Sequence, residues 1–387
     1  MNYDLDESQR AFQATARKFA DQALAPKAQE WDKTSFFPKE VFKEAGKLGF
    51  MAMYIPEEYH GIGLNRLDST LIIEELAAGC TSTAAFISIH NMAFNMLARY
   101  GQQEVIAQWA EALATGEKLV SYCLTEPGAG SDAASLSTKA EKKNVQYILN
   151  GTKAFISGAG ETDLLIVMAR TANIGAKGIS CFAVPADTPG ISFGKKEEKL
   201  GWNSQPTRLI HFEEVAIPEN HLLAEEGRGF HLAMEGLDGG RLNIAACSVG
   251  TAKASLKAAT RYVQERKQFN KAISEFQATQ FKLADMLTEL TASRQMIRLA
   301  AFKLDTNQAD KTAFCAMAKR FATDVGFKIC DEALQLHGGY GYIKEYPIER
   351  YFRDSRVHRI LEGTNEVMRL IIARRILSDD TFSIIHE

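Results

Sequence analysis

The chain has 387 residues, enough for two or three domains with a sizeable hydrophobic core. Lys and Arg total 45 against 48 Asp and Glu, so the net charge of −3 gives no general reason to expect nucleic acid or an anionic membrane as a partner, and any anionic ligand would have to be held by local arginines. The cysteines are scattered without a C-x-x-C pair or a His-Cys cluster, which disfavours zinc, an iron–sulfur cluster or a disulfide framework, so we expect no metal site: Cys80, Cys123, Cys181, Cys247, Cys315 and Cys330.

Residues 1–118 are expected to form an N-terminal α-helical domain. Asp6 and Gln9 have the spacing of a capping box. Apolar residues then recur at steps of four, three and four, which places them on one helix face: Phe12, Ala16, Phe19 and Ala23. The first residues are acidic and lack the basic start and apolar stretch of a signal peptide, and no later stretch is apolar for long enough to cross a bilayer. We therefore expect a protein of a bacterial cytoplasm that does not insert into a membrane.

Residues 119–225 are expected to form a middle β domain, because short apolar runs there are bounded by Gly, Pro and Asn. Two such runs are residues 164–168 and 179–184. Asn150-Gly151 separates the run 147–149 from the run 154–156, and both central positions of a type I′ turn need a positive φ. We therefore predict a β-hairpin with its turn at Asn150-Gly151.

Residues 226–387 return to a helical pattern and are expected to form a C-terminal helical domain. Leucines and other apolar residues keep helical spacing over several turns, which is typical of a bundle or a subunit interface: Leu283, Leu287, Leu290, Ile297, Ala301 and Leu304. The order of helices, strands and helices differs from the strand–helix alternation of a dinucleotide-binding domain, and neither a complete G-x-G-x-x-G nor a G-x-x-x-x-G-K-[ST] motif occurs.

Two segments combine residue types that carry chemistry. Residues 122–132, YCLTEPGAGSD, form a glycine-rich loop after a strand-like run, which is either a surface turn or a place where a ligand approaches free backbone N–H groups. Glu362 lies between Ile360-Leu361 and Gly363. Apolar neighbours can raise the pKa of a carboxyl toward the range of a general base, but a Glu beside a glycine that opens a helix is more often a solvated first-turn residue that the helix dipole favours.

The loop at residues 122–132 resembles the strand and loop of the acyl-CoA dehydrogenase family, and the likeness continues in order from about Asp6 to Arg375. The resemblance implies an α+β multidomain fold, with an N-terminal helical domain, a middle β-barrel or β-sandwich domain and a C-terminal four-helix bundle. It also implies FAD as the cofactor. The loop and the segment Phe155-Ile156-Ser157 would contact FAD, with the Ser157 hydroxyl near the flavin N5, although many members of the family have Trp where this chain has Phe155.

Further segments resemble the family's cofactor contacts. Arg266, Gln277 and the segment Gln335-Leu336-His337-Gly338-Gly339 are similar to residues that reach the FAD of a neighbouring subunit, so the resemblance implies a homotetramer. Thr364 is also a candidate helix N-cap. The implied FAD-binding residues are Tyr122, Leu124, Thr125, Gly130, Ser131, Phe155, Ile156, Ser157, Arg266, Gln277, Gln335, Gly338, Gly339, Thr364, Asn365 and Glu366.

The family oxidises acyl-CoA thioesters, and Glu362 stands at its catalytic base. Some relatives carry the base after the arginine of the segment Asp238-Gly239-Gly240-Arg241, but Leu242 follows that arginine here. The resemblance implies that Glu362 abstracts the α-proton, that the FAD N5 accepts the β-hydride, and that the Glu362 N–H helps to bind the thioester oxygen. It also implies electron-transfer flavoprotein as electron acceptor and the following contacts with the acyl-CoA: Ser131, Asp238, Arg241 and Arg374.

Several stretches resemble those members of the family that convert isobutyryl-CoA to methacrylyl-CoA in valine breakdown: residues 131–136, 201–208, 353–358 and 360–363. A 2-methylbutyryl-CoA or a short straight-chain substrate stays open, because one methylene changes pocket discrimination by only about 1–3 kcal/mol. A relative that holds flavin without catalysis and an oxidase that reduces oxygen are the remaining alternatives. The retained Glu362 and Arg374 argue against the first, and the short chain argues against the second.

Overall fold

The computed structural model describes residues 4–378. The chain divides into two compact units, and each is described by itself. The helical unit comprises Met1–Gln29, Arg66–Thr81 and Arg241–Glu387. The sheet unit comprises Glu30–Asn65 and Ser82–Gly240. Both units therefore combine segments that are far apart in the sequence.

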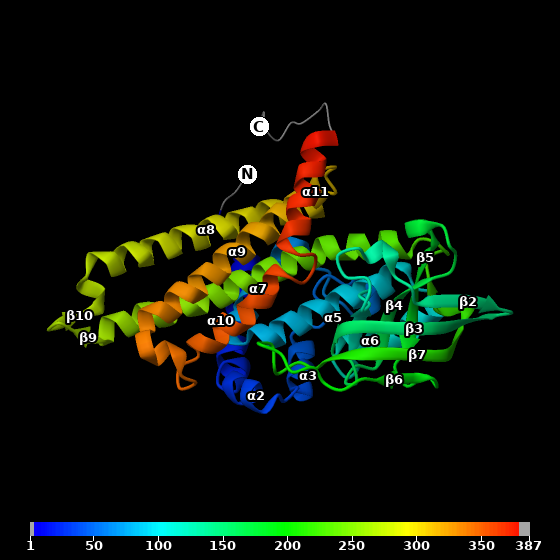
Figure 1. Ribbon diagram of the computed structural model, residues 1–387, viewed down its shortest axis with the longest axis horizontal. Helices are drawn as coiled ribbons and strands as arrows, with labels where there is room; N and C mark the ends of the chain where they lie inside the picture. The colour runs from blue at the N-terminus through cyan, green and yellow to red at the C-terminus, as the bar shows by residue number, and fades with distance from the viewer. Residues whose placement is uncertain (1–3, 379–387) are drawn as a thin grey trace. The chain divides into compact units, whose positions relative to one another are not determined.

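The helical unit is built around α8 and α9, which lie side by side (Figure 1). Helix α4 packs against α1 and α8, and α9 also packs against α10 and α11. A short hairpin of β9 (Lys267–Gln268) and β10 (Lys271–Ala272) joins α7 to α8. Apolar side chains from α7, α8, α9 and α10 form one core. The helix bounds are α1 Glu7–Phe19, α4 Arg66–Gly79, α7 Gly229–Glu265, of which this unit takes the part from Arg241, α8 Gln277–Asp305, α9 Lys311–His337, α10 Ile348–Arg356 and α11 Asn365–Ser378.

The predicted start of the first helix is confirmed, and its apolar face is confirmed in part. The Gln9 N–H donates to Asp6 Oδ1 at 2.8 Å, and the Asp6 N–H donates to Gln9 Oε1 at 3.2 Å. Ala16 and Phe19 are buried as the pattern predicts. The next turn, Ala20–Leu24, is π-helical, and this wider turn buries Leu24 while Ala23 stays only partly covered.

The stripe predicted on the long helix α8 also faces the core only in part. Leu290, Ile297 and Ala301 are buried, whereas Leu287 is 54% exposed. The spacing of the apolar residues therefore identifies the helix correctly, but part of its apolar surface faces away from the core of this unit.

The sheet unit contains one eight-stranded sheet with the order β6-β7-β3-β2-β4-β5-β8, in which β1 pairs in parallel with β4. Helices α5 and α6 contribute to a core with β1, β4 and β5, and a second core includes side chains of β3, β5 and β7. The bounds are β1 Val120–Cys123, β2 Lys139–Lys143, β3 Gln146–Ser157, β4 Leu164–Arg170, β5 Ile179–Pro185, β6 Ile191–Phe193, β7 Thr207–Pro218, β8 Leu222–Leu223, α2 Ala28–Thr34, α3 Lys39–Lys47, α5 Thr81–Tyr100 and α6 Gln103–Ala114.

The hairpin predicted at Asn150-Gly151 is wrong. These residues lie inside the continuous strand β3, where the register with β7 shifts between Leu149 and Gly151. Asn150 contacts the neighbouring strand, because the Glu214 N–H donates to its Oδ1 at 2.9 Å. A side chain at Gly151 would meet the Thr138 backbone at 2.7 Å. The Asn-Gly pair therefore marks a β-bulge with a close backbone approach, which has the same sequence signature as a tight turn.

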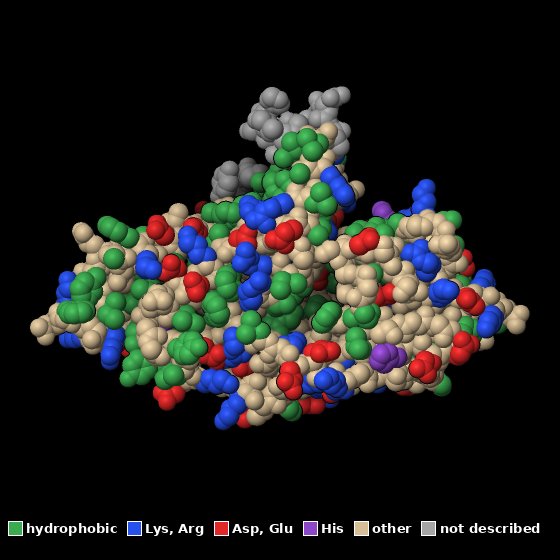
Figure 2. All heavy atoms as spheres, viewed as in Figure 1, with side chains coloured by type: hydrophobic (Ala, Val, Ile, Leu, Met, Phe, Trp, Pro, Cys, Tyr) green, Lys and Arg blue, Asp and Glu red, His purple; other side chains and the backbone are tan. Residues whose placement is uncertain are grey.

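The predicted order of a helical region, a β region and a second helical region is confirmed. The division into domains at residues 118/119 and 225/226 stays a prediction. On the face drawn in Figure 2, basic and acidic side chains are interspersed and are not gathered by sign.

Candidate active site

Glu362 stands at a sharp turn between two helical segments of the helical unit. The 3₁₀ turn Val357–Arg359 precedes it, and α11 begins at Asn365, where Thr364 Oγ1 accepts the Val367 N–H at 3.2 Å. Glu362 and Gly363 both have positive φ, 55° and 86°. This conformation costs little at glycine but strains Glu362 by roughly 1 kcal/mol or more. The surrounding structure therefore holds Glu362 in a backbone conformation that is unfavourable for a non-glycine residue.

Glu362 as a residue is only partly buried, but one oxygen of its carboxylate lies in the protein interior. Its Oε2 is shielded from solvent and has no hydrogen-bond partner among the described residues. Burial raises the pKa of Glu362 to about 7, while Arg241 and Lys319 act in the opposite direction. A carboxyl group with this pKa exchanges a proton near neutral pH, as a general base must. The predicted base thus has the electrostatic environment that the role requires.

Arg241 is part of this environment. It lies on α7 with only 4% of its surface exposed, and its Nε stands 3.5 Å from the Glu362 backbone carbonyl oxygen. This distance is at the long limit of a hydrogen bond, so the main effect of the guanidinium on the base is its charge. The sequence predicts Arg241 as a contact of the acyl-CoA and does not predict its position beside the base.

Lys319 is a second cation at this turn, and sequence reasoning missed it. It lies on α9, fully buried, and its Nζ donates to the Gly363 carbonyl oxygen at 2.7 Å and to Asn365 Oδ1 at 3.0 Å. Burial lowers the pKa of Lys319 to about 7, against the opposing effect of Glu362. One signal could have found it: Lys319 follows Cys315 by four residues and precedes Ala322 by three, so it falls on the apolar stripe of α9.

The Asn365 side chain is buried and fully engaged within the protein. Its amide nitrogen donates to Thr323 Oγ1 at 3.0 Å and to Asp324 Oδ1 at 2.9 Å, and its oxygen accepts from Lys319. This occupancy argues against a direct contact between the Asn365 side chain and a cofactor. Glu366, in the first turn of α11, is exposed, and its pKa is lowered chiefly by a hydrogen bond with its own backbone N–H.

In the sheet unit, a buried ion pair fixes the glycine-rich loop. Lys153 Nζ donates to Glu126 Oε1 at 2.7 Å and to the Leu124 carbonyl at 2.9 Å. The N–H groups of Ser137 and Thr138 also donate to the Glu126 carboxylate. Burial by itself would raise the pKa of Glu126, but Lys153 and these donors outweigh it and lower the pKa to about 2. The base of the loop is therefore rigid and ionised.

Phe155 has the second unusual backbone conformation among the predicted site residues. Its φ is 56° within a register shift of β3, and its ring is 71% exposed. A bulge of this kind turns one side chain away from the sheet. The Ala154 N–H donates to the Thr125 carbonyl at 2.8 Å, which ties the strand to the glycine-rich loop. An exposed aromatic ring beside a rigid loop is suited to contact a planar ring system such as a flavin.

The other predicted flavin contacts of the sheet unit differ in exposure. Leu124 and Ile156 are buried, and Tyr122 is partly buried. Gly130 and Ser131 are exposed, and a Cβ at Gly130 would meet no atom within 4 Å, which leaves room for a ligand. The Ser157 hydroxyl stands 3.3 Å from Gln205 Nε2, which donates to it. Asp238, a predicted substrate contact in the same unit, is 5% exposed. These residues fit a bound FAD at the glycine-rich loop and the bulge.

The residues predicted to reach the FAD of a neighbouring subunit all lie on the surface of the helical unit. Arg266, at the end of α7, stands over the Tyr340 ring with its guanidinium carbon 5.6 Å from the ring centre. Tyr340 belongs to the 3₁₀ turn Gly338–Tyr342. The structure thus brings Arg266 and the Gly338-Gly339 segment together, and every predicted residue of this group is exposed: Arg266, Gln277, Gln335, Gly338 and Gly339.

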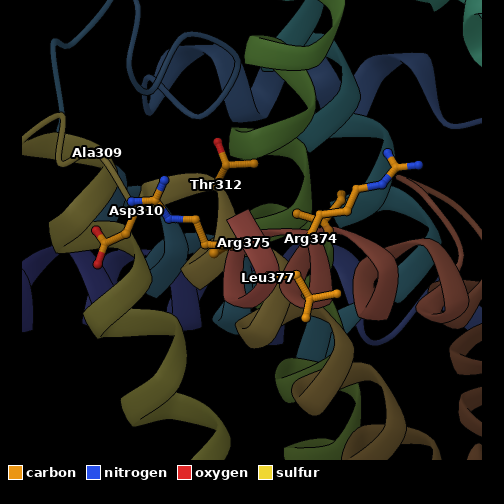
Figure 3. A pocket seen from close by; sticks show the side chains of 8 residues that line it. Ala309, Asp310, Thr312, Arg374, Arg375 and Leu377 are labelled. Carbon is orange, nitrogen blue, oxygen red and sulfur yellow. The ribbon is translucent and has the colours of Figure 1, made fainter. Parts of the chain in front are cut away.

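A pocket of about 570 Å³ lies where α11 meets the start of α9, and Glu362 is not among its lining residues. Arg374 and Arg375 point to opposite sides of α11, and Arg375 extends toward the side of Asp310 (Figure 3). The lining residues are Ala309, Asp310, Thr312, Ala313, Ile371, Arg374, Arg375 and Leu377. The predicted substrate residue Arg374 therefore lines a pocket that does not include the predicted base.

All six cysteines are buried, and none of them forms a disulfide bond. Among residues 4–378, no group of three or more His, Cys, Asp or Glu side chains is arranged to hold a metal ion.

Comparison with known proteins identifies the family of the chain. Models of the N-terminal, middle and C-terminal domains of acyl-CoA dehydrogenase match residues 6–117, 121–215 and 227–377. Mitochondrial isobutyryl-CoA dehydrogenase of Dictyostelium discoideum is 55% identical, over 97% of this chain and 91% of that protein. The enzyme of the same name from Bos taurus is 52% identical, over 97% and 90%.

Among solved structures, butyryl-CoA dehydrogenase from Megasphaera elsdenii matches with a TM-score of 0.94 and 38% identity, over 97% of this chain and 100% of that chain. Sequence and fold therefore agree. The chain belongs to the acyl-CoA dehydrogenase family.

Proposed function

We propose that this chain is an FAD-dependent dehydrogenase that converts isobutyryl-CoA to methacrylyl-CoA, with Glu362 as the base that removes the α-proton. The family makes it an oxidoreductase that acts on acyl-CoA thioesters with FAD as cofactor. The observation that carries the role of Glu362 is its buried, unpartnered Oε2 together with a pKa raised to about 7. Two relatives that are more than 50% identical and are named isobutyryl-CoA dehydrogenase support the substrate.

The reaction requires a weakly acidic α-proton to leave while negative charge develops on the thioester oxygen. Ionised Glu362 accepts the proton at its Oε2, and the positive charges of Arg241 and Lys319 favour that ionised form. No described residue accepts the Glu362 N–H in a hydrogen bond, so this donor is available to the thioester oxygen and can stabilise the developing charge. Bound FAD supplies the acceptor for the β-hydride.

The residues that would hold FAD are the exposed loop around Gly130 and Ser131 and the bulge at Phe155, with the Ser157 hydroxyl as a hydrogen-bonding group. Thr364 serves both as a partner for FAD and as the N-cap of α11. The rigid Lys153–Glu126 pair keeps the loop from collapsing when no ligand is bound. Asp238, Arg241, Ser131 and Arg374 stay the proposed contacts of the acyl-CoA.

We also propose a homotetramer, in which Arg266, Gln277, Gln335 and Gly338-Gly339 of one subunit reach the FAD of another, and electron-transfer flavoprotein as electron acceptor. The exposed group formed by Arg266 and the Gly338–Tyr342 turn supports the first proposal. Sedimentation of the FAD-bound protein measures its subunit number. Reoxidation of the reduced enzyme by electron-transfer flavoprotein, compared with reoxidation by oxygen, tests the acceptor.

Within residues 4–378, no helix is long and apolar enough to cross a membrane. The bacterial cytoplasm predicted from the sequence stays a prediction. The two relatives that are more than 50% identical are both mitochondrial by name. Fractionation of cells of the source organism would locate the protein.

The substrate is tested by mixing the FAD-bound enzyme with single acyl-CoAs in the absence of oxygen and following the loss of flavin absorbance. We expect isobutyryl-CoA to bleach the flavin with the highest ratio of rate to half-saturating concentration. Faster bleaching by 2-methylbutyryl-CoA or butyryl-CoA would replace the proposed substrate with that thioester. Bleaching by none of the three would leave a flavin-binding protein without this activity.

A further inference from the structure

Lys319 is buried below the turn that carries the base, and the reaction proposed above does not use it directly. It is fully shielded from solvent on α9, and Glu362 on the turn is the charged group that acts on it most strongly. Burial of an uncompensated ammonium costs several kcal/mol. A lysine at this position is therefore expected to have a structural or functional role that offsets this cost. We propose that Lys319 is a positioning residue for the base: its ammonium anchors the Gly363–Asn365 backbone and keeps the adjacent Glu362 carboxylate in place and ionised.

The first part of the argument is geometric. Lys319 Nζ donates to the carbonyl oxygen of Gly363, the residue directly after Glu362, and to the side chain of Asn365, the first residue of α11. Asn365 in turn is bound by Thr323 and Asp324 on the same face of α9. The turn is thus fixed on its C-terminal side by three residues of one helix. This anchor explains how Glu362 keeps its left-handed φ of 55°.

The second part is electrostatic. Glu362 and Lys319 form a coupled pair, in which each favours the charged form of the other. The other charged groups that act on this pair are Arg241 from α7, Asp324 from α9 and Glu366 from α11. His358 faces Lys319 from the 3₁₀ turn, but burial lowers the pKa of His358 to about 3, so it is neutral at working pH. Removal of the Lys319 ammonium therefore leaves Arg241 as the only cation that favours ionised Glu362 among the groups that act on it in the described residues.

The test replaces Lys319 with Met, which keeps the length of the side chain but removes the charge and the donors, and with Gln, which keeps a donor but no charge. The inference rests on the proposed function, so the rate of flavin bleaching by isobutyryl-CoA is measured against pH. In Lys319→Met we expect the pH at half-maximal rate to rise from about 7 by one unit or more, which lowers the rate at pH 7 about fivefold or more. Misplacement of the base should also lower the plateau at high pH. Lys319→Gln should recover part of that plateau while its midpoint stays raised.

A second readout does not depend on turnover. The carbonyl stretch of protonated Glu362, identified as the infrared band that is absent in Glu362→Gln, is titrated in the FAD-bound protein without substrate. Its midpoint should rise in both Lys319 variants, and Lys319→Arg, which keeps a charge, should leave it near the wild-type value. If none of the acyl-CoAs bleaches the flavin of the wild-type enzyme, the proposed function fails. The infrared titration still tests the role of Lys319 in that case.

Lys253→Met is the matched control. Lys253 is a partly buried lysine of α7 in the helical unit, and its Nζ pairs with Glu75 of α4 at 2.5 Å. The Lys253→Met variant should keep the wild-type midpoint in both pH titrations even if its stability falls. An unchanged midpoint in both Lys319→Met and Lys319→Gln, or an equal rise in Lys253→Met, overturns the proposal. If Lys319→Met does not fold, the comparison of Lys319→Gln with Lys319→Arg decides the question in the same way.

Discussion

Two buried lysines, Lys319 in the helical unit and Lys153 in the sheet unit, hold a functional turn in different ways. Lys153 lies 2.7 Å from the ionised carboxylate of Glu126, and this carboxylate also accepts hydrogen bonds from two backbone N–H groups. The pKa of Glu126 is therefore lowered to about 2. Lys319 donates to a carbonyl and an amide oxygen, and neither of these is charged. Glu362 next to it keeps an unbonded oxygen and a pKa near 7.

The difference shows what distinguishes a structural carboxylate from a reactive one. Direct hydrogen bonds to the charged form hold a carboxylate ionised and remove its ability to exchange a proton. A buried carboxylate with cations nearby but no donor on its oxygen stays close to the point where either form is accessible. The same residue types, Lys and Glu, thus build a rigid support in one unit and a base in the other.

The largest effect is expected from Glu362→Gln. The amide cannot accept the α-proton, so the rate of flavin bleaching by the acyl-CoA should fall by about 10³-fold or more, while FAD and the thioester still bind. Anaerobic stopped-flow absorbance measures the rate, and flavin fluorescence measures the binding. Bleaching at a tenth of the wild-type rate or faster would mean that another group removes the proton.

The same variant has a separate effect on stability. The pKa of Glu362 is raised from its ordinary value of 4.5 to about 7, so its contribution is most favourable below pH 4.5 and is lost as the pH rises through 7. Glu362→Gln has no such dependence. Its melting temperature should therefore exceed that of the wild type by a wider margin at pH 8 than at pH 5. Equal margins at the two pH values would contradict the buried titration.

A smaller but clear loss is expected from Lys153→Met in the sheet unit. This change leaves the buried Glu126 carboxylate without its cation, and removal of one partner from a buried pair costs about 3–5 kcal/mol. Urea unfolding at pH 7 measures the loss. Lys142→Met on the neighbouring strand β2, whose lysine is half exposed and pairs with an exposed Glu219, should change the unfolding free energy by less than about 0.5 kcal/mol.

The difference between wild type and Lys153→Met should also depend on pH. The pKa of Glu126 is depressed from 4.5 to about 2, so the stability that the pair contributes is present above pH 4.5 and is lost as the pH falls toward 2. The free energies of unfolding of the two proteins should therefore become more similar as the pH falls. A difference in unfolding free energy that stays constant between pH 5 and pH 3 would show that the lysine acts mainly through packing.

The smallest effect on stability is expected from Phe155→Gly. Glycine adopts the left-handed φ without strain but gains entropy in the unfolded chain, so the net stabilisation should be about 0.5 kcal/mol or less. Loss of the ring should weaken FAD binding by about 3–10-fold, as for a lost aromatic contact. Titration of the apoprotein with FAD measures this. Phe36→Gly, at an exposed ring of the same unit without positive φ, should lower stability and leave FAD binding unchanged.

Several features of the fold follow from local sequence because their cause is local. The capping box at Asp6 and Gln9 and the helix–strand–helix order depend on neighbours within a few residues, and both are confirmed. The turn predicted at Asn150-Gly151 fails because the reason for that glycine is the close approach of Thr138, which directly precedes strand β2. The exposure of Leu287 on α8 is likewise decided by what packs against the helix.

The sequence by itself determined that a carboxylate stands beside a glycine at residue 362, and its resemblance to a family gave that carboxylate a role. The tertiary structure alone decided that the Oε2 of this carboxylate is shielded from solvent without a hydrogen-bond donor and that Arg241 and Lys319, 121 and 43 residues earlier in the chain, act on its charge. The physical reason is that a pKa depends on burial and on charges within a few ångströms. Those distances are set by how α7, α9 and the turn pack, and no local pattern records them.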